Sequence, residues 1–350
     1  MGKQILKVTL KDVAAKAKVS MTTASLAINN IHSARINNKT KDRVIKAAEE
    51  LGYRANRIAQ SLANGKTGII GLAISGFVTP LFSTSFFSEL IRGVGVGLEE
   101  SGYNLLLLSA KRGTEPDQLY WETIGTGLLD GIILEGNFIK DEFILRLEEE
   151  NFPYILIGRE LIQKEVNYIK LDYSGGSSQS VKHLIKLGHS HIGFIGGTKI
   201  KTMTNMIERE KGYIHELKEN GIELIPDFIV RCDNLTCDEG YKSMQVILSN
   251  HIKPTAIIAG HDSLAIGAMN AIKENGLCVP EDIAVIGFDD TPESLIVSPK
   301  LTTIRFPLFD LGRASADMLN NILNKDGKKI REQKVLPTQL IVRESCGGFK

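Results

Sequence analysis

Several side chains with binding chemistry stand directly after short apolar runs, where parallel strands present their carboxyl ends. They are Ser75, Phe77, Arg159, His261 and Asp289. Ligands of open α/β sheets bind beyond these strand ends. An arginine donates in a fork to vicinal hydroxyls or a carboxylate, and an aspartate accepts from hydroxyl or amine donors. These positions therefore predict a site for a small polar molecule, although Arg159 also fits an interface ion pair and Ser75 a strand-end cap.

The patterns of common catalytic and cofactor sites are missing. The Gly-Lys-Thr at 65–67 resembles the end of a phosphate loop, but Gln60 stands where its first glycine is required. The glycine run 93–97 lacks the third glycine of a dinucleotide fingerprint, and no GxSxG motif occurs. Three histidines at a helix end and turn are interpreted as structural: His183, His189 and His191. We therefore expect no enzyme, no cofactor and no metal.

The chain from residue 68 onward alternates apolar strand-like runs with amphipathic helical runs, which is typical of parallel sheets covered on both faces. The expected strands lie at 69–74, 103–110, 131–136, 154–159, 191–197, 255–260 and 283–289. Because the pattern restarts near residue 166, we expect an α/β body of two similar, doubly wound parallel-sheet subdomains.

The charge is unevenly distributed along the chain. Residues 1–66 contain thirteen Lys and Arg against four Asp and Glu, a formal charge of +9, whereas the remainder carries −8. Such a division favours a polyanion-binding head on a body that does not need that charge. The alternative is a basic terminus that is merely solvated.

The head is expected to contain three short helices. Thr9 and Asp12 have the spacing of a capping box, and Ser20 is the expected N-cap of the second helix. A third helix is expected over 40–51, ending at Gly52. Small apolar residues at the helix contacts and a tight turn between the first two helices predict an all-α helix-turn-helix head. The alternative is a three-helix protein-interaction module.

The second helix presents one face away from the predicted head core. Ala24, Ala27 and Ile28 face inward at helical spacing, which leaves Met21, Thr22, Ser25 and Leu26 outward. Met21, Thr22 and Leu26 are expected to reach base edges, while hydroxyl and amide side chains contact phosphates. The proposed contacts with double-stranded DNA in the head are Thr9, Ser20, Met21, Thr22, Ser25, Leu26 and Asn29.

These residues carry a family resemblance. Two N-terminal segments resemble the signature of the lactose-repressor/galactose-repressor family of transcription regulators. They are VTLKDVAAKAKVSMTTASLAIN and RVIKAAEELGYRANRIAQSLANGKTGIIGLAI. The resemblance continues in DGIIL, HLIKLGHSHIGFIGG, VPEDIAVIGFDD and LTTIRFP. It implies a repressor that binds a palindromic operator as a homodimer, with a tetramer also possible. It also implies a small effector, a sugar or related metabolite, in an interdomain cleft.

The resemblance also assigns site residues and boundaries. It places Arg209 and Asp289 among the effector ligands, with His261 where Asn or Asp is usual and Leu235 where several members stack an aromatic ring. Similarity to periplasmic sugar-binding proteins implies three chain crossings between the subdomains. The expected divisions are a head at 1–55, a hinge helix and linker at 56–67 and a body at 68–345. Within the body, one subdomain is expected at about 68–162 plus 294–324. The other is expected at about 163–293 plus 325–345.

Three positions depart from the family pattern in the head and linker. Lys18 occupies a turn position that is usually Gly, Leu26 a recognition position that is often Arg or His, and Ala55 a position that is commonly Pro. Lysine is less suited than glycine to a positive φ. Leucine offers a base only apolar contact, for instance to a thymine methyl.

The segment 56–63 carries an apolar stripe of Ile58, Ala59 and Leu62, yet a helix this short is marginal alone in water. We expect it to fold only when two copies meet over DNA, with Asn56 and Gln60 beside the DNA. The resemblance gives Leu62 the role of a wedge in the minor groove. The alternative is that Leu62 packs on the body.

The remaining features concern compartment and rival functions. The chain has no apolar run of membrane-span length and no secretory signal, and its four cysteines form no CxxC motif. These features favour a reduced, cytoplasmic protein. A solute-binding receptor, a sugar-modifying enzyme and a regulator with a protein or phosphorylated corepressor are the competing interpretations, and the sequence discriminates the last one poorly.

Overall fold

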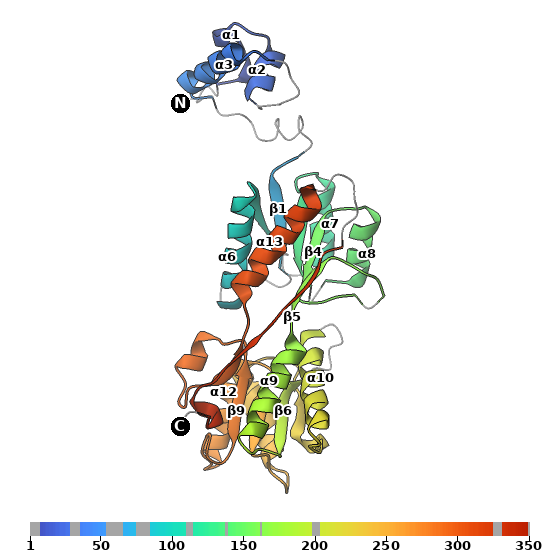
Figure 1. Cartoon of the computed structure of the whole chain (residues 1–350), viewed down its shortest axis with the longest axis vertical. Helices are drawn as coiled ribbons and strands as arrows, with labels where there is room; N and C mark the ends of the chain where they lie inside the picture. The colour runs from blue at the N-terminus through green and yellow to red at the C-terminus, as the bar shows by residue number, and fades with distance from the viewer. Residues whose placement is uncertain are drawn as a thin grey trace, which may run out of the picture. The chain divides into compact units, whose positions relative to one another are not determined.

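The computed structural model divides into two compact units, Met1–Gly68 and Ile69–Lys350. It describes residues 8–28, 36–53, 66–74, 85–109, 115–136, 139–161, 163–197, 204–324 and 331–348. Figure 1 labels the helices and strands of each unit. The expected combination of a helical head and an α/β body is confirmed.

The head contains α1 (Leu10–Ala17), α2 (Met21–Ile28) and α3 (Asn38–Leu51). The backbone N–H and the hydroxyl of Thr9 both donate to Asp12 Oδ2, and Ser20 Oγ accepts from the Thr23 N–H. Both expected caps are therefore present. The third helix begins two residues earlier than expected, because Asn37 provides its N-cap.

The core of the head is built from small side chains. Val13, Ala14, Ala17, Ala24, Ala27, Val44 and Ala47 form its buried cluster. Lys18, at the turn between α1 and α2, adopts φ 53 and ψ 48. This left-handed conformation is the one that the sequence analysis associated with glycine, and here a lysine occupies it.

The first sheet of the larger unit has six parallel strands in the order β11-β5-β4-β3-β1-β2. Their bounds are β1 (Ile69–Ala73), β2 (Asn104–Leu108), β3 (Gly131–Glu135), β4 (Tyr154–Ile157), β5 (Tyr168–Leu171) and β11 (Gln333–Leu336). Helices α6 (Ser85–Glu100) and α13 (Leu308–Asn324) cover one face, and α7 (Pro116–Gly125) and α8 (Asp141–Glu149) cover the other. We call this sheet with its helices the first lobe.

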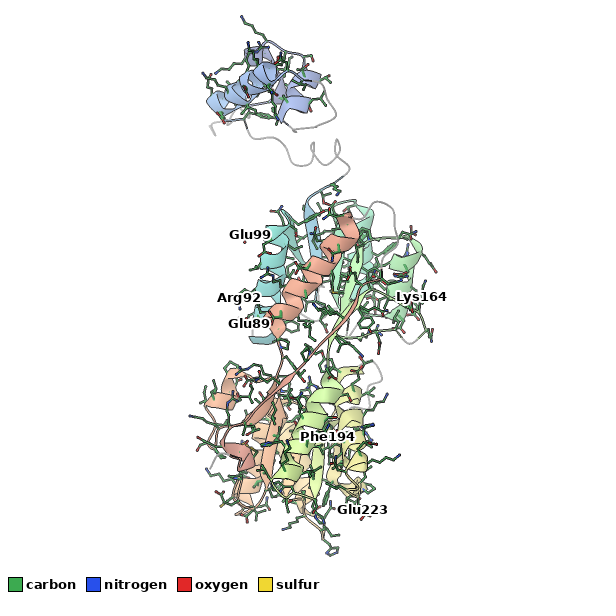
Figure 2. The ribbon with its side chains drawn as sticks, in the orientation of Figure 1. Glu89, Arg92, Glu99, Lys164, Phe194 and Glu223 are labelled. Atoms are coloured by element: carbon green, nitrogen blue, oxygen red, sulfur yellow. The ribbon has the colours of Figure 1, made fainter. Side chains whose placement is uncertain are left out.

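The second sheet has six strands in the order β12-β10-β9-β8-β6-β7, with only β12 antiparallel to its neighbour. Their bounds are β6 (Ile192–Gly197), β7 (Ile229–Arg231), β8 (Ala256–Ala259), β9 (Ala284–Phe288), β10 (Thr302–Arg305) and β12 (Gln339–Ile341). The covering helices are α9 (Tyr173–Lys186) and α10 (Thr204–Glu219) on one face, and α11 (Cys237–Leu248) and α12 (Asp262–Glu274) on the other. Together they form the second lobe, in whose core Phe194 lies (Figure 2).

Short 3-10 helices complete the described part of the larger unit: η2 (Pro226–Phe228), η3 (Pro292–Leu295) and η4 (Glu344–Cys346). Helices α6 and α13 pack closely beside each other, and on the outer face of α6 the side chains of Glu89 and Arg92 form an ion pair (Figure 2). The close approach depends on Gly93, where an added Cβ would lie 2.1 Å from the Phe309 carbonyl oxygen. No helix among the described residues is long and apolar enough to cross a membrane.

The boundaries between the lobes differ from those expected. β5 was expected in the second lobe but pairs with β4 in the first sheet, and β11 likewise joins the first sheet through β5. β10 was expected in the first lobe but pairs with β9 in the second. The three crossings therefore fall after β5, β10 and β11. The alternation of strands and helices in the sequence does not reveal these positions. The strand before each crossing still belongs to the sheet that the chain then leaves.

Candidate functional site

The outward face of α2 forms the candidate DNA-contacting surface of the head. Met21 is 53% exposed, Thr22 is also exposed, and Ser25 and Leu26 are partly exposed. Ala24 and Ala27 lie in the head core, as expected. Thr9 and Ser20 are exposed at the starts of α1 and α2, where their hydroxyls take part in the caps. Asn29, Asn56, Gln60 and Leu62 lie outside the described residues.

The second lobe brings together three of the sequence-predicted effector residues. Arg209 lies on α10, His261 is the N-cap of α12, and Asp289 follows β9. The Arg209 guanidinium donates to Asp289 Oδ1 at 3.1 Å, and His261 Nε2 lies 3.0 Å from Asp289 Oδ2. Arg209 also donates to the Gly260 carbonyl. Each oxygen of the Asp289 carboxylate is therefore in contact with one of the other two side chains.

The charges of this cluster depend on one another. Burial raises the pKa of Asp289, but Arg209 and His261 outweigh that effect and hold it below the usual range. Burial lowers the pKa of His261, but Asp289 outweighs that effect and raises it overall. Asp262, the first residue of α12, has its pKa raised by burial to about 7. The site thus holds one firmly ionised carboxylate, a histidine whose pKa is raised by that carboxylate and a second carboxyl group whose pKa is about 7.

Three aromatic rings surround the Arg209 guanidinium. Its central carbon lies 4.8 Å from the Phe288 ring centroid, 5.1 Å from that of Phe306 and 5.2 Å from that of Tyr173. Tyr173 and Phe306 also contact each other edge to face. Such faces attract the cation and leave it little freedom to reorient. Tyr173 and Phe306 are not among the site residues predicted from the sequence, and the signal available for both is that they stand within two residues of a strand end.

The turn that carries Asp289 is held from several sides. Asp289 and Asp290 have φ values of 100 and 53, in the region that favours glycine. Arg305 Nε donates to one oxygen of Asp290 at 2.6 Å, and Arg343 donates to the other at 2.5 Å. Asp262 accepts from the Thr291 N–H at 2.7 Å. These bonds hold a strained backbone that presents Asp289 to Arg209.

Arg159 has a different environment from the other predicted effector residues. It follows β4 in the first lobe, and its guanidinium donates to the carbonyls of Gly136 and Ile139 and to Asp141 Oδ1 at 2.8, 2.6 and 2.7 Å. These bonds tie Arg159 to the backbone just after β3 and to the start of α8. The structural interpretation as an ion pair is therefore the better one for Arg159, although the pair lies within the lobe. Ser75 and Phe77 lie outside the described residues.

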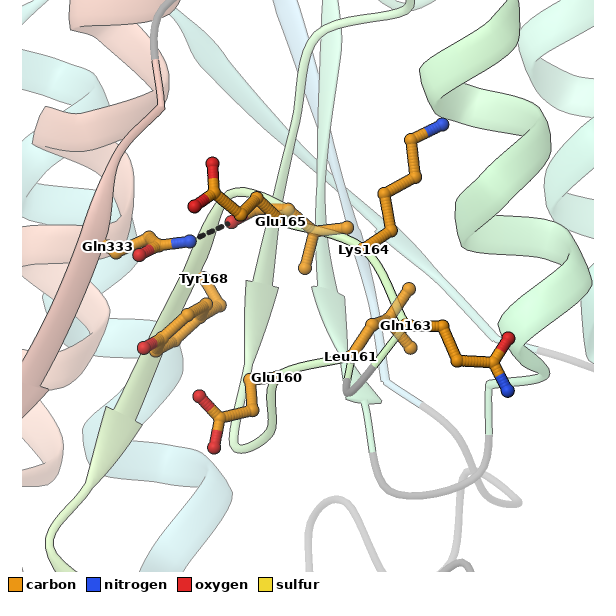
Figure 3. A pocket seen from close by; sticks show the side chains of 8 residues that line it. Glu160, Leu161, Gln163, Lys164, Glu165, Tyr168 and Gln333 are labelled. Atoms are coloured by element: carbon orange, nitrogen blue, oxygen red, sulfur yellow. Dashed lines mark hydrogen bonds between the residues drawn. The ribbon is translucent and has the colours of Figure 1, made fainter.

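Two cavities lie away from this cluster. One, of about 360 Å³, lies beside the β4–β5 connection and contains Glu160, Lys164 and Tyr168; Figure 3 shows Gln333 donating there to the Val166 carbonyl. The other, of about 580 Å³, lies along α12 and includes Met269, Cys278 and Val297. Neither cavity includes Arg209, His261 or Asp289. The described residues contain no cluster of three or more His, Cys, Asp or Glu that could hold a metal ion.

Comparison with family models matches both units. Residues 9–56 match the model of bacterial regulatory proteins of the lacI family, and residues 181–346 match a periplasmic binding protein-like domain. These ranges include α2 in the head and the Arg209, His261 and Asp289 cluster in the second lobe.

Relatives match along nearly the whole chain. The chain is 34% identical to the probable HTH-type transcriptional repressor ExuR of Bacillus subtilis over 97% of this chain and 98% of that protein. It is 31% identical to catabolite control protein A of Priestia megaterium over 92% and 94%. The first of these relatives is named as a probable transcriptional repressor.

Solved structures share this fold. A lac repressor dimer bound to operator and the anti-inducer ONPF matches with a TM-score of 0.80 and 28% identity, over 97% of this chain and 98% of that chain. A complex of the transcriptional regulator CelR with cellobiose matches with a TM-score of 0.73 and 30% identity, over 97% and 99%. The extent and identity of these matches show that the chain belongs to the lacI family of DNA-binding transcriptional regulators.

Proposed function

We propose that this chain is a cytoplasmic repressor that binds a palindromic operator as a homodimer and is switched by a small polyhydroxy metabolite between the lobes. The observation that carries the proposal is the exposed Met21–Thr22 face of α2, set on a buried alanine contact with α1 and α3. The formal charge of +9 over residues 1–66 supplies the phosphate attraction.

The proposed DNA contacts comprise side chains of the described head and of the segment that follows it. In the head they are Thr9, Ser20, Met21, Thr22, Ser25 and Leu26, and beyond the described residues they are Asn29, Asn56, Gln60 and Leu62. The relative bound to an operator as a dimer supports the homodimer and the DNA partner. A minor-groove wedge at Leu62 would unstack one base step, and the resulting bend would add contacts that offset this cost.

The proposed effector site is centred on Arg209 and Asp289, with Ser75 and Phe77 contributing from the first lobe. An arginine fork beside a carboxylate matches a pair of vicinal hydroxyls, because the arginine donates to their oxygens and the carboxylate accepts their protons. The relative crystallised with cellobiose supports a carbohydrate as the ligand class. Binding there would shift the relative population of two body conformations and so alter operator affinity.

The test is selection of duplexes from a random library on the full-length protein, followed by titration at several salt concentrations. A palindromic consensus, and affinity that falls steeply with salt, are expected. An unenriched library would contradict the proposal. With the selected duplex, a panel of monosaccharides, disaccharides, uronic acids and nucleosides is then screened by thermal shift, and Arg209→Ala provides the control that should bind none.

A further inference from the structure

Both ring nitrogens of His261 are already engaged. The backbone N–H of Ser263 lies 3.0 Å from Nδ1. Because a backbone N–H can only donate, Nδ1 must accept this hydrogen bond. Nε2 lies 3.0 Å from Asp289 Oδ2, and a carboxylate that remains ionised can only accept. Only the neutral imidazole with its proton on Nε2 satisfies both contacts. In this form His261 has no polar atom left for a ligand.

We propose that His261 is a positioning residue of the effector site, present as the neutral Nε2–H tautomer, which caps α12 and orients the Asp289 carboxylate. The inference rests on the proposed function only in that it takes this cluster to be the effector site. It assigns the direct polar contacts with the effector to Arg209 and Asp289, and it changes the role that the sequence suggested for His261. A hydroxyl-rich ligand meets the remaining lone pairs of Asp289 and not the imidazole.

The bond from Ser263 makes this role dependent on the protonation of the ring. A second proton on Nδ1 would place two donors against each other and a positive charge at the N-terminus of α12, which is unfavourable there. The charged groups that face the ring are Asp289 from the end of β9, Arg209 from α10 and Asp262 from α12. Asp289 favours the cation, whereas the cap favours the neutral ring. Acid therefore breaks the cap while it strengthens the contact with Asp289.

The experiment is a nitrogen NMR titration of the full-length protein labelled with ¹⁵N-histidine, in the absence of DNA and effector. His261→Asn identifies the His261 signals by their loss. At pH 8 the expected signals are a protonated Nε2 and an unprotonated, hydrogen-bonded Nδ1. Asp289→Asn removes the charge that favours the cation, so the His261 midpoint should fall by about one pH unit or more. The exposed His251 provides a control signal that should be the same in both proteins.

Two results would overturn the assignment. One is a proton on Nδ1 at pH 8, and the other is a His261 midpoint that does not move in Asp289→Asn. Circular dichroism of both variants checks that they fold, and unfolding of His261→Ala should begin at a lower temperature because the cap is lost. Since no DNA or ligand is used, failure here leaves the proposed repressor function standing. Conversely, a failed operator selection leaves the tautomer result intact.

Discussion

The guanidinium of Arg209 and the carboxylate of Asp289 lie 3.1 Å apart although the two residues are 80 positions apart in the chain. The Arg209 side chain is 3% exposed and that of Asp289 is 12% exposed. A charge pair this far from water depends on both partners, because neither can be solvated alone. The pair therefore serves the fold of the second lobe as well as the proposed effector site.

Asp289→Asn should lower the free energy of unfolding by about 3–5 kcal/mol, the usual cost of leaving a buried charge unpaired. Urea denaturation at pH 7.5 measures it. Asp238→Asn is the matched control, because its ion pair with Lys242 is exposed and screened by water and should contribute far less to stability. Equal effects of the two substitutions would show that the Arg209–Asp289 pair is not buried in solution.

Asp262 should give the second lobe a specific pH dependence. Its folded pKa of about 7 lies above the usual aspartate value of 3.8, so between these pH values the folded chain holds a proton that the unfolded chain has released. Its contribution to stability therefore falls as pH rises from about 4 to 7. Asp262→Asn keeps an acceptor for the Thr291 N–H, and the difference in unfolding free energy between the two proteins should show this slope. A pH-independent difference would contradict the prediction.

Two glycines of α6 should respond to alanine in opposite ways. Gly93→Ala would place a Cβ 2.1 Å from the Phe309 carbonyl oxygen and should destabilise the first lobe, since backbone must move. Nothing lies within 4 Å of a Cβ at Gly95, so Gly95→Ala should stabilise the protein by about 0.5–1 kcal/mol. Thermal unfolding compares them, and the same sign for both would refute the close α6–α13 packing.

Lys18→Gly should stabilise the head, because glycine adopts φ 53 without the steric cost that lysine bears. The gain should not exceed about 1 kcal/mol, since glycine also has more freedom to lose on folding. Lys18→Ala is the control: it retains the Cβ and should give no gain. Calorimetry of the full-length protein resolves the effect if the head unfolds as a separate transition, and hydrogen exchange of α1 and α2 amides measures it otherwise.

Met21→Ala should weaken binding to the selected operator by about 1–3 kcal/mol, the usual scale of one lost specific contact. Affinity for an unrelated duplex should scarcely change, because the phosphate contacts remain. Ile45→Ala, at a 38% exposed position on α3, is the control that should alter neither affinity. An equal loss on both duplexes would place Met21 outside the base-reading surface.

Local patterns in the sequence determined the head and part of the strands of the body. The capping pair Thr9 and Asp12 and the alanine contacts of α1 and α2 depend on neighbours within a few residues, so they can be predicted from the sequence. The same holds for the apolar runs of β1, β2, β3, β4, β6, β8 and β9, whereas no run predicted β5 or β7. At Lys18 the family resemblance gave only a position that is usually Gly, and the structure supplies the positive φ.

Tertiary structure decided what depends on residues far apart in the chain. β5, β10 and β11 are assigned to their sheets by pairing partners rather than by their own apolar pattern. Arg159 and Arg209 are the same residue type, yet Arg159 pairs with Asp141, 18 positions earlier in the chain, and Arg209 pairs with Asp289, 80 positions later. The tautomer of His261 follows from contacts on both its nitrogens. Sequence spacing specifies periodicity, whereas hydrogen bonds and ion pairs form only where the packed chain brings a donor and an acceptor within reach.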